Sequence, residues 1–583
     1  MNIHRTLFSL ATVAMTATAA GAQQPAQQTG PLPINQDARQ VAQRLDEHMK
    51  RLVPFGYSGS LLVGKDGQVV LAHGYGLADR ENNVAVTPET VFDIGSITKQ
   101  FTAAAILKLE MEGKVSVNDP VSRWFPDVPA DKQGMTLHHL LTHSSGLQDV
   151  FGGDYQVAER DSLAGVILAS RLQWAPGTRY DYSNAGYSLL AMVVEKASGM
   201  PYEDYARQKL WAPAGMTRTG YRGVQWRPGE LAVGYRGGQR WGTPTDHLWA
   251  ADGPYWNLRG NGGVLSSVAD LFRWHQALEG DAILSAEAKR KMWMPHVPED
   301  PEGRSHYGYG WAIGPTARGT KLIAHNGGNG IFFADFRRYV DEGVVVLVMS
   351  NTTEAPAERT LTAVARTIFG GGEVVAPPAA AGGDPARAAA AAGTYRLSGD
   401  ATMAVAADGE RLVLRPQGQE AYALLNGGVG DARMDSLGAR AVAMLRAAAD
   451  GDYALLLRAF GPEVPEGEIR AEHEEYMTDA RARLGALQGV EHVGTSPRGG
   501  RAFTTVRLRF ERGTPLLRVT WAGDRVSGVT PMREPPAAVF VPVAPDAWAS
   551  YDIGTGAISR VRLEAGALVV DTPAGPVRAS RSE

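Results

Sequence analysis

The sequence predicts an α+β fold: an antiparallel sheet flanked by helices with an inserted helical lobe, followed by a C-terminal mixed, β-rich accessory region. Two β-hairpin patterns and one break in composition predict this arrangement. The hairpins lie at residues 58–76 and 330–350, with mostly helical patterns between them, and the break covers residues 370–392. Because strands at both ends of one region can share a sheet, the helices between them are expected to cover it and to form the lobe.

The composition excludes several classes of protein. The chain has 583 residues, 44% of them hydrophobic, and this length favours several domains. A formal net charge of −4 leaves no basic face for nucleic acid or anionic lipid. Because the chain has no cysteine, disulfides, cysteine nucleophiles, thiolate metal sites and a lipidated cysteine anchor are all excluded.

The first 22 residues have the pattern of a signal peptide. A short polar start precedes the apolar run "LFSLATVAMTATAA", and "AGA" before Gln23 fits a small-residue cleavage site. The run is shorter than the roughly 18 residues that span a bilayer, and no other segment is long enough. We expect export to a periplasm or to the medium, with no stable membrane insertion.

Residues 36–370 are predicted to form one domain. Apolar residues recur with helical spacing over 38–53. The first hairpin turns at Lys65-Asp66-Gly67, and the second turns at Asp341-Glu342-Gly343, both turn signals between apolar β-rich runs.

A linker, residues 371–391, and an accessory region, residues 392–583, are predicted to follow. The linker is rich in Gly, Ala and Pro. In the accessory region, "GTYRL", "TMAVAADGERLVLRP" and "AYALL" read as strands, and the chain ends in further β patterns. Helical patterns followed by strands at about 436–530 are similar in order to nuclear-transport-factor-2-like cones, and could be an insertion into a β module.

Ser96 and Lys99 form the first candidate motif, in "FDIGSITKQFTAAAILKLEMEGK". If a helix begins at Ser96, positions i and i+3 place both side chains on one face. The free N–H groups of a helix N-terminus can hold a developing oxyanion, and a desolvated lysine can serve as a base. Serine is also a favoured helix cap, and the motif taken alone favours that structural role.

Tyr182 and Asn184 form the second candidate motif, in "PGTRYDYSNAGYSLL". Their spacing of two lets both side chains point into one cleft from an extended turn. A tyrosine beside an ammonium group is expected to have a lowered pKa and to transfer protons. An asparagine can hold an amide or ester carbonyl. The structural alternatives are core packing for the tyrosine and a helix cap for the asparagine.

The third candidate motif is "KLIAHNGGNG", with His325, Asn326 and Gly327 at the end of a predicted strand. An edge strand that ends in glycines lets a substrate lie alongside it, and the N–H of Gly328 is a candidate oxyanion donor. A loop histidine with satisfied hydrogen bonds is the structural alternative.

Taken together, the motifs resemble the serine β-lactamase and penicillin-binding-protein superfamily, in its class C β-lactamase, esterase and D-aminopeptidase branch. The resemblance covers about residues 40–370. It lies in the successive blocks "IGSITKQFTAAAILKLEMEGK", "LLTHSSGL", "PGTRYDYSNAGYSLLAMVVEKASG", "GNGGVLSSVADLFRW" and "HNGG". It implies a β-lactamase/transpeptidase-like fold and a serine hydrolase that needs no cofactor.

The resemblance also implies residue roles. Ser96 would be the acylated nucleophile, Lys99 and Tyr182 the proton-transfer network, and Asn184 a group that positions the acyl side. The edge strand would be lined by His325, Asn326 and Gly327, and the Ser96 and Gly328 N–H groups would form the oxyanion hole.

One departure from the family bears on the substrate. Class C lactamases usually carry Lys-Thr-Gly at the third motif, where the lysine binds a substrate carboxylate, whereas this chain carries histidine, as related D-peptidases, D-aminopeptidases and esterases do. The resemblance therefore implies an ester or a D-amino-acid amide or peptide as substrate. A β-lactamase or peptidoglycan D,D-peptidase remains an alternative, as does a non-catalytic protein that binds cell-wall fragments.

"LHHLLTHSSGL" raises the question of a metal site. On one helix, His139 and His143 would be at i and i+4, a spacing that metal ligands use, with His138 beside them. No glutamate follows His139 as in a zinc-protease helix, and the resemblance implies a structural helix–turn. We therefore expect no metal.

Overall fold

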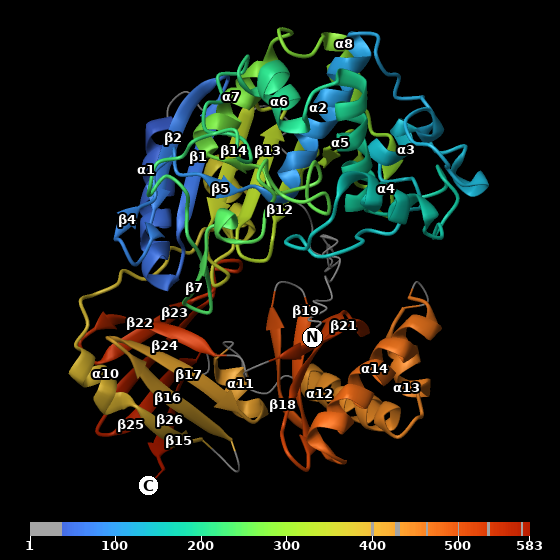
Figure 1. The fold of residues 1–583 in the computed structure, drawn as a ribbon. Coiled ribbons are helices and arrows are strands. Elements are labelled where there is room, and N and C mark those ends of the chain that lie inside the picture. Colours follow the sequence, from blue (N-terminus) through green and yellow to red (C-terminus); the bar gives the residue numbers. More distant parts are fainter. Residues whose placement is uncertain are drawn as a thin grey trace. The chain divides into compact units, whose positions relative to one another are not determined.

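The computed structural model describes residues 38–397, 401–425, 432–461, 464–498, 501–532, 537–572 and 575–582. The predicted signal peptide lies outside the described residues. The described residues divide into two compact units, one up to Glu373 and the other from Val374 onward (Figure 1). This division falls within the predicted linker. In the described part of the chain, no helix is both long enough and apolar enough to cross a membrane.

The first unit is built on one antiparallel sheet of eight strands, in the order β2-β1-β14-β13-β12-β11-β10-β9. The two predicted hairpins are neighbours in this sheet, since β1 of the first pairs with β14 of the second. The prediction that both ends of this region share one sheet is therefore confirmed. The strands are β1 Gly59–Lys65, β2 Gln68–Tyr75, β9 Val297–Pro298, β10 His306–Tyr307, β11 Ala312–Pro315, β12 Lys321–Gly328, β13 Phe333–Tyr339 and β14 Val344–Ser350.

The turn of the first hairpin follows the sequence prediction closely. Asp66 has φ 49° and Gly67 has φ 75°. Positive φ at both central residues of a two-residue loop matches the right-handed twist of the flanking strands, and Asp-Gly tolerates it well. Local chemistry therefore fixes the register of β1 and β2.

Helices from both ends of the unit pack beside the sheet. The predicted helix at 38–53 is α1, Ala38–Leu52, which contacts β2 and α9, Leu361–Phe369. A third helix, α7, Val268–Glu279, contacts β1 and β14. Small strand pairs complete the connections: β3 Leu77–Asp79 with β4 Val84–Ala85, β5 Phe92–Asp93 with β8 Leu265–Ser266, and β6 Gly234–Arg236 with β7 Gln239–Gly242.

The predicted helical lobe lies between the hairpins in the sequence. Its central helix α2, Thr98–Met111, buries residues on every side, from Thr98 to Leu107 and at Leu109. A helix without a polar face must be enclosed, and α2 runs against α5, Asn184–Ser198 (Figure 1). The remaining helices are α3 Leu137–Leu141, α4 Arg160–Ala169, α6 Tyr202–Ala206 and α8 Ala286–Met292.

The second unit contains a closed β-barrel with an insertion. The barrel order is β15-β16-β17-β22-β23-β24-β25-β26. The predicted β-rich character is confirmed. The barrel strands are β15 Gly393–Arg396, β16 Thr402–Asp408, β17 Arg411–Gln417, β22 Ala538–Ala544, β23 Ala547–Tyr551, β24 Ile558–Glu564, β25 Ala567–Thr572 and β26 Gly575–Arg581.

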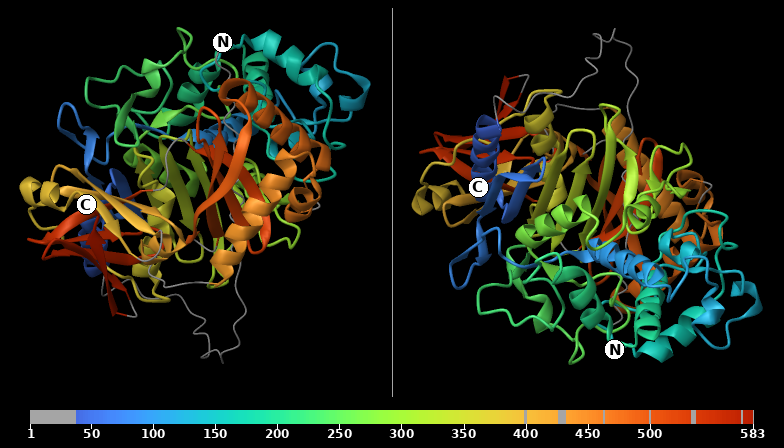
Figure 2. Two further views of the ribbon diagram at one scale, coloured as in Figure 1. Left: turned by 90° about the horizontal axis from the view of Figure 1, so that it is seen from below. Right: turned by 90° about the horizontal axis from the view of Figure 1, so that it is seen from above.

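The insertion between β17 and β22 has its own sheet and its own core. Its helices pack beside its four-stranded sheet β18-β19-β20-β21 (Figure 2). The elements are α12 Ala432–Ala449, α13 Ala454–Ala459, α14 Glu466–Leu484, β18 Leu487–Arg498, β19 Arg501–Phe510, β20 Leu516–Ala522 and β21 Arg525–Met532.

One local prediction in this unit is wrong. "AYALL" is not a strand but part of helix α11, Gln419–Leu425; its Ala421 and Leu424 pack into the barrel core. Part of the predicted linker is also helical: α10, Pro385–Ala391, buries Ala388 and Ala391 in the same core. Both segments are rich in alanine or leucine, which favour a helix, and both bury apolar side chains in the barrel core.

Candidate active site

Ser96 lies in a turn that leads into the central helix of the lobe. Residues Gly95–Ile97 form a 3₁₀ turn and α2 begins at Thr98, so the α-helix starts two residues later than predicted. The i, i+3 relation survives because side chains three apart are in line in a 3₁₀ turn. The Lys99 Nζ atom donates a hydrogen bond to Ser96 Oγ at 3.1 Å.

Lys99 is completely buried at the base of this site. Its Nζ atom also donates to Asn184 Oδ1 at 2.6 Å and to the Asn261 carbonyl at 2.8 Å. Burial lowers the pKa of Lys99 to about 7, although the nearby carboxylates of Asp149 and Asp154 act to raise it. A large share of Lys99 is therefore an uncharged amine at neutral pH, able to accept a proton.

Tyr182 completes the group around the serine. The Tyr182 hydroxyl is hydrogen-bonded to the Ser96 side chain, and the Lys99 Nζ atom lies 4.7 Å from the centre of the Tyr182 ring. The predicted lowered pKa of Tyr182 is wrong. Burial raises this pKa, and the hydrogen bond from Ser96 offsets only part of that effect. The phenol therefore keeps its proton beside a lysine that is partly uncharged at neutral pH.

Asn184 is held in place by Asp149. The backbone N–H and the Nδ2 of Asn184 both donate to Asp149 Oδ1, at 2.9 and 2.8 Å. Ser183 caps the same helix, since its Oγ accepts from the Gly186 N–H at 3.1 Å. These contacts turn the Asn184 carbonyl oxygen toward Lys99. Sequence reasoning missed Asp149, which follows the "LLTHSSGL" block in a loop with no periodic pattern.

The edge of β12 lies directly beside the serine. A Cβ atom added to Gly327 would be 2.0 Å from the Ile94 carbonyl oxygen and 2.6 Å from the Ser96 nitrogen. A Cβ atom added to Gly95, which has φ +51°, would be 2.2 Å from the Gly328 nitrogen. Only glycines allow this close approach of the two backbones.

The outer edge of β12 is free of strand pairing near its end. Pairing with β11 stops at Ala324, whereas pairing with β13 continues to Gly328. The Asn329 N–H donates to the Phe332 carbonyl at 3.2 Å. Because hydrogen-bonded and non-hydrogen-bonded pairs alternate in an antiparallel ladder, the N–H of Gly328 points away from β13, toward the serine side.

His325 is buried on this strand in a defined tautomer. Its Nδ1 lies 2.6 Å from the Asn326 carbonyl oxygen, which can only accept, so Nδ1 carries the hydrogen. Its Nε2 then accepts from the Tyr307 hydroxyl at 2.8 Å. Burial, and secondarily Lys99, lower the pKa of His325 to about 4. The His325 ring is therefore neutral at pH 7 and supplies no positive charge. The side chain of Asn326, the next residue on the strand, is exposed.

The other histidines do not converge on a common point. His138 Nδ1 pairs with the Tyr309 hydroxyl at 2.8 Å, and His139 Nδ1 accepts from the Thr136 N–H at 3.2 Å. The helix α3 ends at Leu141, so His143 lies beyond it, and the assumed i, i+4 relation does not hold. Among the residues that the structure describes, no group of three or more His, Cys, Asp or Glu side chains could hold a metal ion.

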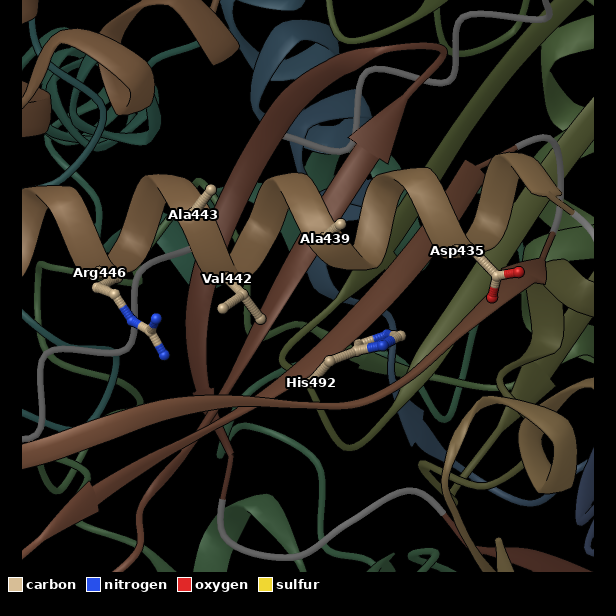
Figure 3. Close-up of a pocket in the computed structure, with 6 residues that line it drawn as sticks. All are labelled: Asp435, Ala439, Val442, Ala443, Arg446 and His492. Carbon is tan, nitrogen blue, oxygen red and sulfur yellow. The ribbon is translucent and has the colours of Figure 1, made fainter. Parts of the chain in front are cut away.

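A pocket in the second unit offers no comparable chemistry. It has a volume of about 480 Å³ and lies between α12 and β18 (Figure 3). Its His492 pairs with Thr495 Oγ1 at 2.9 Å, and its Arg446 donates to the Val490 carbonyl at 3.2 Å. Its histidine and its arginine are thus already bonded within the unit. The lining residues are Asp435, Ala439, Val442, Ala443, Arg446 and His492.

Comparison with known proteins assigns the first unit. The model of the β-lactamase family matches residues 53–369, more than half of the chain. Penicillin-binding protein 4* of Bacillus subtilis is 29% identical over 388 residues, which cover 62% of this chain and 84% of that protein. The putative penicillin-binding protein PbpX of the same organism is 32% identical over 47% of this chain and 66% of its own length.

One solved structure resembles the chain over almost its whole length. It is the octameric penicillin-binding protein homologue from Pyrococcus abyssi, with a TM-score of 0.52 and 23% identity. The match covers 93% of this chain and 100% of that one. At this level of identity it supports the fold.

Proposed function

The chain belongs to the β-lactamase family and is a serine hydrolase, and from this premise we propose that it forms an acyl-enzyme on Ser96 with an ester or a D-amino-acid amide or peptide. One observation carries this proposal. Ser96 Oγ lies 3.1 Å from the Nζ of a buried lysine whose pKa is about 7. That pair provides a nucleophile and an uncharged base at neutral pH.

Acylation follows from the positions of these groups. Neutral Lys99 takes the Ser96 proton, directly or through the Tyr182 hydroxyl, as Oγ attacks the acyl carbon. The N–H groups of Ser96 and Gly328 stabilise the oxyanion that develops on the carbonyl oxygen. Because Tyr182 is a protonated phenol, it can deliver a proton to the leaving alkoxide or amine and regain one from Lys99. Water then attacks the acyl-enzyme and releases the acid.

The charges around the cleft favour neutral or cationic substrates over carboxylates. His325 is neutral, and it stands where relatives that bind a substrate carboxylate carry lysine. Asp149 and Asp154 both act electrostatically on Lys99. These carboxylates would repel a substrate carboxylate. They would not repel an uncharged ester, and they would attract the ammonium group of a D-amino-acid amide. The β-lactamase and D,D-peptidase alternatives are correspondingly disfavoured.

A binding protein for cell-wall fragments is the alternative from another class. The hydrogen-bonded set of Ser96, Lys99 and Tyr182 argues against it, because a purely binding cleft gains nothing from a buried lysine of lowered pKa. We also infer from the N-terminal pattern that the mature protein is exported and meets small-molecule or peptide substrates, including peptidoglycan fragments, outside the cytoplasm.

The test is turnover of a short-chain p-nitrophenyl ester by the mature protein beside Ser96→Ala. We expect turnover by the wild type and a fall to background in the variant. D-amino-acid amides and a chromogenic cephalosporin follow, and the cephalosporin should be the poorest substrate. Equal activity of wild type and variant would refute Ser96 as nucleophile. Retained binding of a peptidoglycan fragment by both, with no turnover of any substrate, would support the binding protein.

A further inference from the structure

His143 holds both flanks of Tyr182. The Asp181 N–H donates to the His143 carbonyl at 2.7 Å, and the Ser183 N–H donates to His143 Nδ1 at 3.0 Å. The backbone N–H groups of the residues before and after Tyr182 are therefore both bonded to one residue. Such a clamp restricts the backbone from which the phenol projects.

The ring of His143 also supports the phenol ring directly. The centroids of the His143 and Tyr182 rings lie 4.1 Å apart with an interplanar angle of 31°. The rings of Tyr307 and Tyr187 also pack against His143, with centroids 4.6 and 5.0 Å from that of the imidazole. His143 itself is completely buried. The phenol therefore rests on a ring that has no room to move.

The hydrogen bond from Ser183 fixes the tautomer of His143. Nδ1 accepts from a backbone N–H, so Nε2 carries the hydrogen. Within the described residues Nε2 has no hydrogen-bond partner. The single polar contact of this ring is thus directed at the backbone next to Tyr182. Burial and the nearby Lys99 also lower the pKa of His143, which keeps the ring neutral.

The backbone of His143 is itself unusual. It has φ 55°, a left-handed conformation that costs free energy for a residue with a side chain and that asparagine, aspartate and histidine tolerate best. This conformation follows the end of α3 and turns the ring back toward the 181–183 segment. Residues held in such conformations cluster at functional sites.

We propose that His143 is a positioning residue that holds the Tyr182 hydroxyl in line with Ser96. It contacts neither substrate nor the reacting atoms and acts through Tyr182 alone. The inference rests on the proposed function, and it predicts that His143 matters only when the Tyr182 hydroxyl is present.

A double-mutant cycle in kcat separates this role from general packing. His143→Ala should lower kcat for the ester by about 100-fold, the loss expected when a proton-transfer group is misplaced by about 1 Å. KM should change by less than about threefold, because the substrate contacts remain. In a Tyr182→Phe background, the same substitution should cost no more than about twofold, since the hydroxyl to be positioned is already gone.

His143→Asn is the conservative variant. Asparagine tolerates the left-handed backbone, and its Oδ1 can accept the Ser183 N–H, but it lacks the ring. It should lose only about tenfold in kcat and keep the melting temperature close to that of the wild type. This variant carries the cycle if His143→Ala does not fold. His138→Asn, a partly buried histidine of the same segment bonded to Tyr309, is the matched control and should retain wild-type kcat.

Equal losses from His143 substitution in the presence and absence of the Tyr182 hydroxyl would overturn the inference, as would a Tyr182→Phe variant with wild-type kcat. Failure of the proposed function has a different signature, since Ser96→Ala would then be as active as the wild type.

Discussion

The Nζ atom of Lys99 lies 3.1 Å from the Oγ atom of Ser96, and the same Nζ is bonded to the Asn261 carbonyl and to the Asn184 side chain. All three hydrogen bonds use the amine as donor. A neutral amine has two hydrogens and one lone pair. When Lys99 loses one proton, its nitrogen gains a lone pair that can accept the hydrogen of the Ser96 hydroxyl. The other two hydrogen bonds keep the nitrogen in position.

The pH dependence of ester hydrolysis should report the titration of Lys99. Burial lowers its pKa to about 7, and only the neutral form accepts the Ser96 proton. We expect kcat/KM to rise about tenfold per pH unit below 7 and to level off above it. The measurement is a pH–rate profile from pH 5 to 9 with a non-ionising ester. A single rise near pH 4 would instead implicate a carboxylate or His325 as the base.

Lys99→Met should change stability in a pH-dependent way. The folded pKa of about 7 lies below the unfolded value of 10.5, so the unfolded state binds more protons between these values and wild-type stability rises with pH there. The penalty of the buried lysine is fully present below pH 7. Methionine removes this penalty. Between the two pKa values the stability of the wild type changes by about 1.4 kcal/mol per pH unit. The melting temperature of the variant minus that of the wild type should therefore be several degrees larger at pH 6 than at pH 9.

The control for this stability measurement is Lys321→Met, on an exposed side chain of β12. Its difference from the wild type should stay constant with pH. A constant difference for Lys99→Met as well would contradict the lowered pKa of Lys99.

Asp149 should affect both the charge and the geometry of the site. Asp149→Asn keeps an oxygen acceptor for Asn184 but removes the charge that raises the pKa of Lys99. The rise of kcat/KM should therefore shift to lower pH, with the plateau largely retained. Asp149→Ala should in addition lower the plateau about tenfold, because Asn184 loses both its bonds to the carboxylate.

Asp154→Asn separates the two effects of Asp149. Asp154 acts on Lys99 electrostatically, and no hydrogen bond joins it to Asn184 within the described residues. It should shift the profile to lower pH without lowering the plateau. A shift to higher pH in either Asn variant would be inconsistent with the electrostatic argument.

Gly327→Ala should lower kcat by about 100-fold or more. Its Cβ would be 2.0 Å from the Ile94 carbonyl oxygen and 2.6 Å from the Ser96 nitrogen, so the edge of β12 must move away from the serine. Displacing one oxyanion donor costs about 100-fold or more in kcat. Gly165→Ala, in α4 and with no atom within 4 Å of the added Cβ, is the control and should retain wild-type kcat. Wild-type kcat in Gly327→Ala would disprove the close approach.

Sequence patterns predicted those features that depend on residues close together in the chain. The Asp66-Gly67 turn needs two positive φ angles that this dipeptide tolerates. Ser96 and Lys99 meet because three residues of helix or 3₁₀ turn fix their relation. The two hairpins were correctly placed in one sheet because apolar strands must pair with other strands, and these two hairpins lie at the two ends of the same region.

The tertiary structure decided everything that depends on burial or on distant contacts. The predicted lowered pKa of Tyr182 was wrong because desolvation, with a smaller contribution from Asp149, outweighs the hydrogen bond from Ser96. As part of a helix, "AYALL" places Ala421 and Leu424 in the barrel core, a contact that its own sequence does not reveal. Asp149 and the Asn261 carbonyl had no sequence signal because their partners are distant in the chain. Asp149 is 35 residues from Asn184, and Asn261 is 162 residues from Lys99.

By itself the sequence determined the fold class, the family and the residue types available for chemistry, because these follow from local patterning. Only the tertiary structure decided which of those residues are neutral, which donate and which accept. The physical reason is that protonation and hydrogen-bond direction depend on the solvent and the charges around a group, and distant parts of the chain supply both.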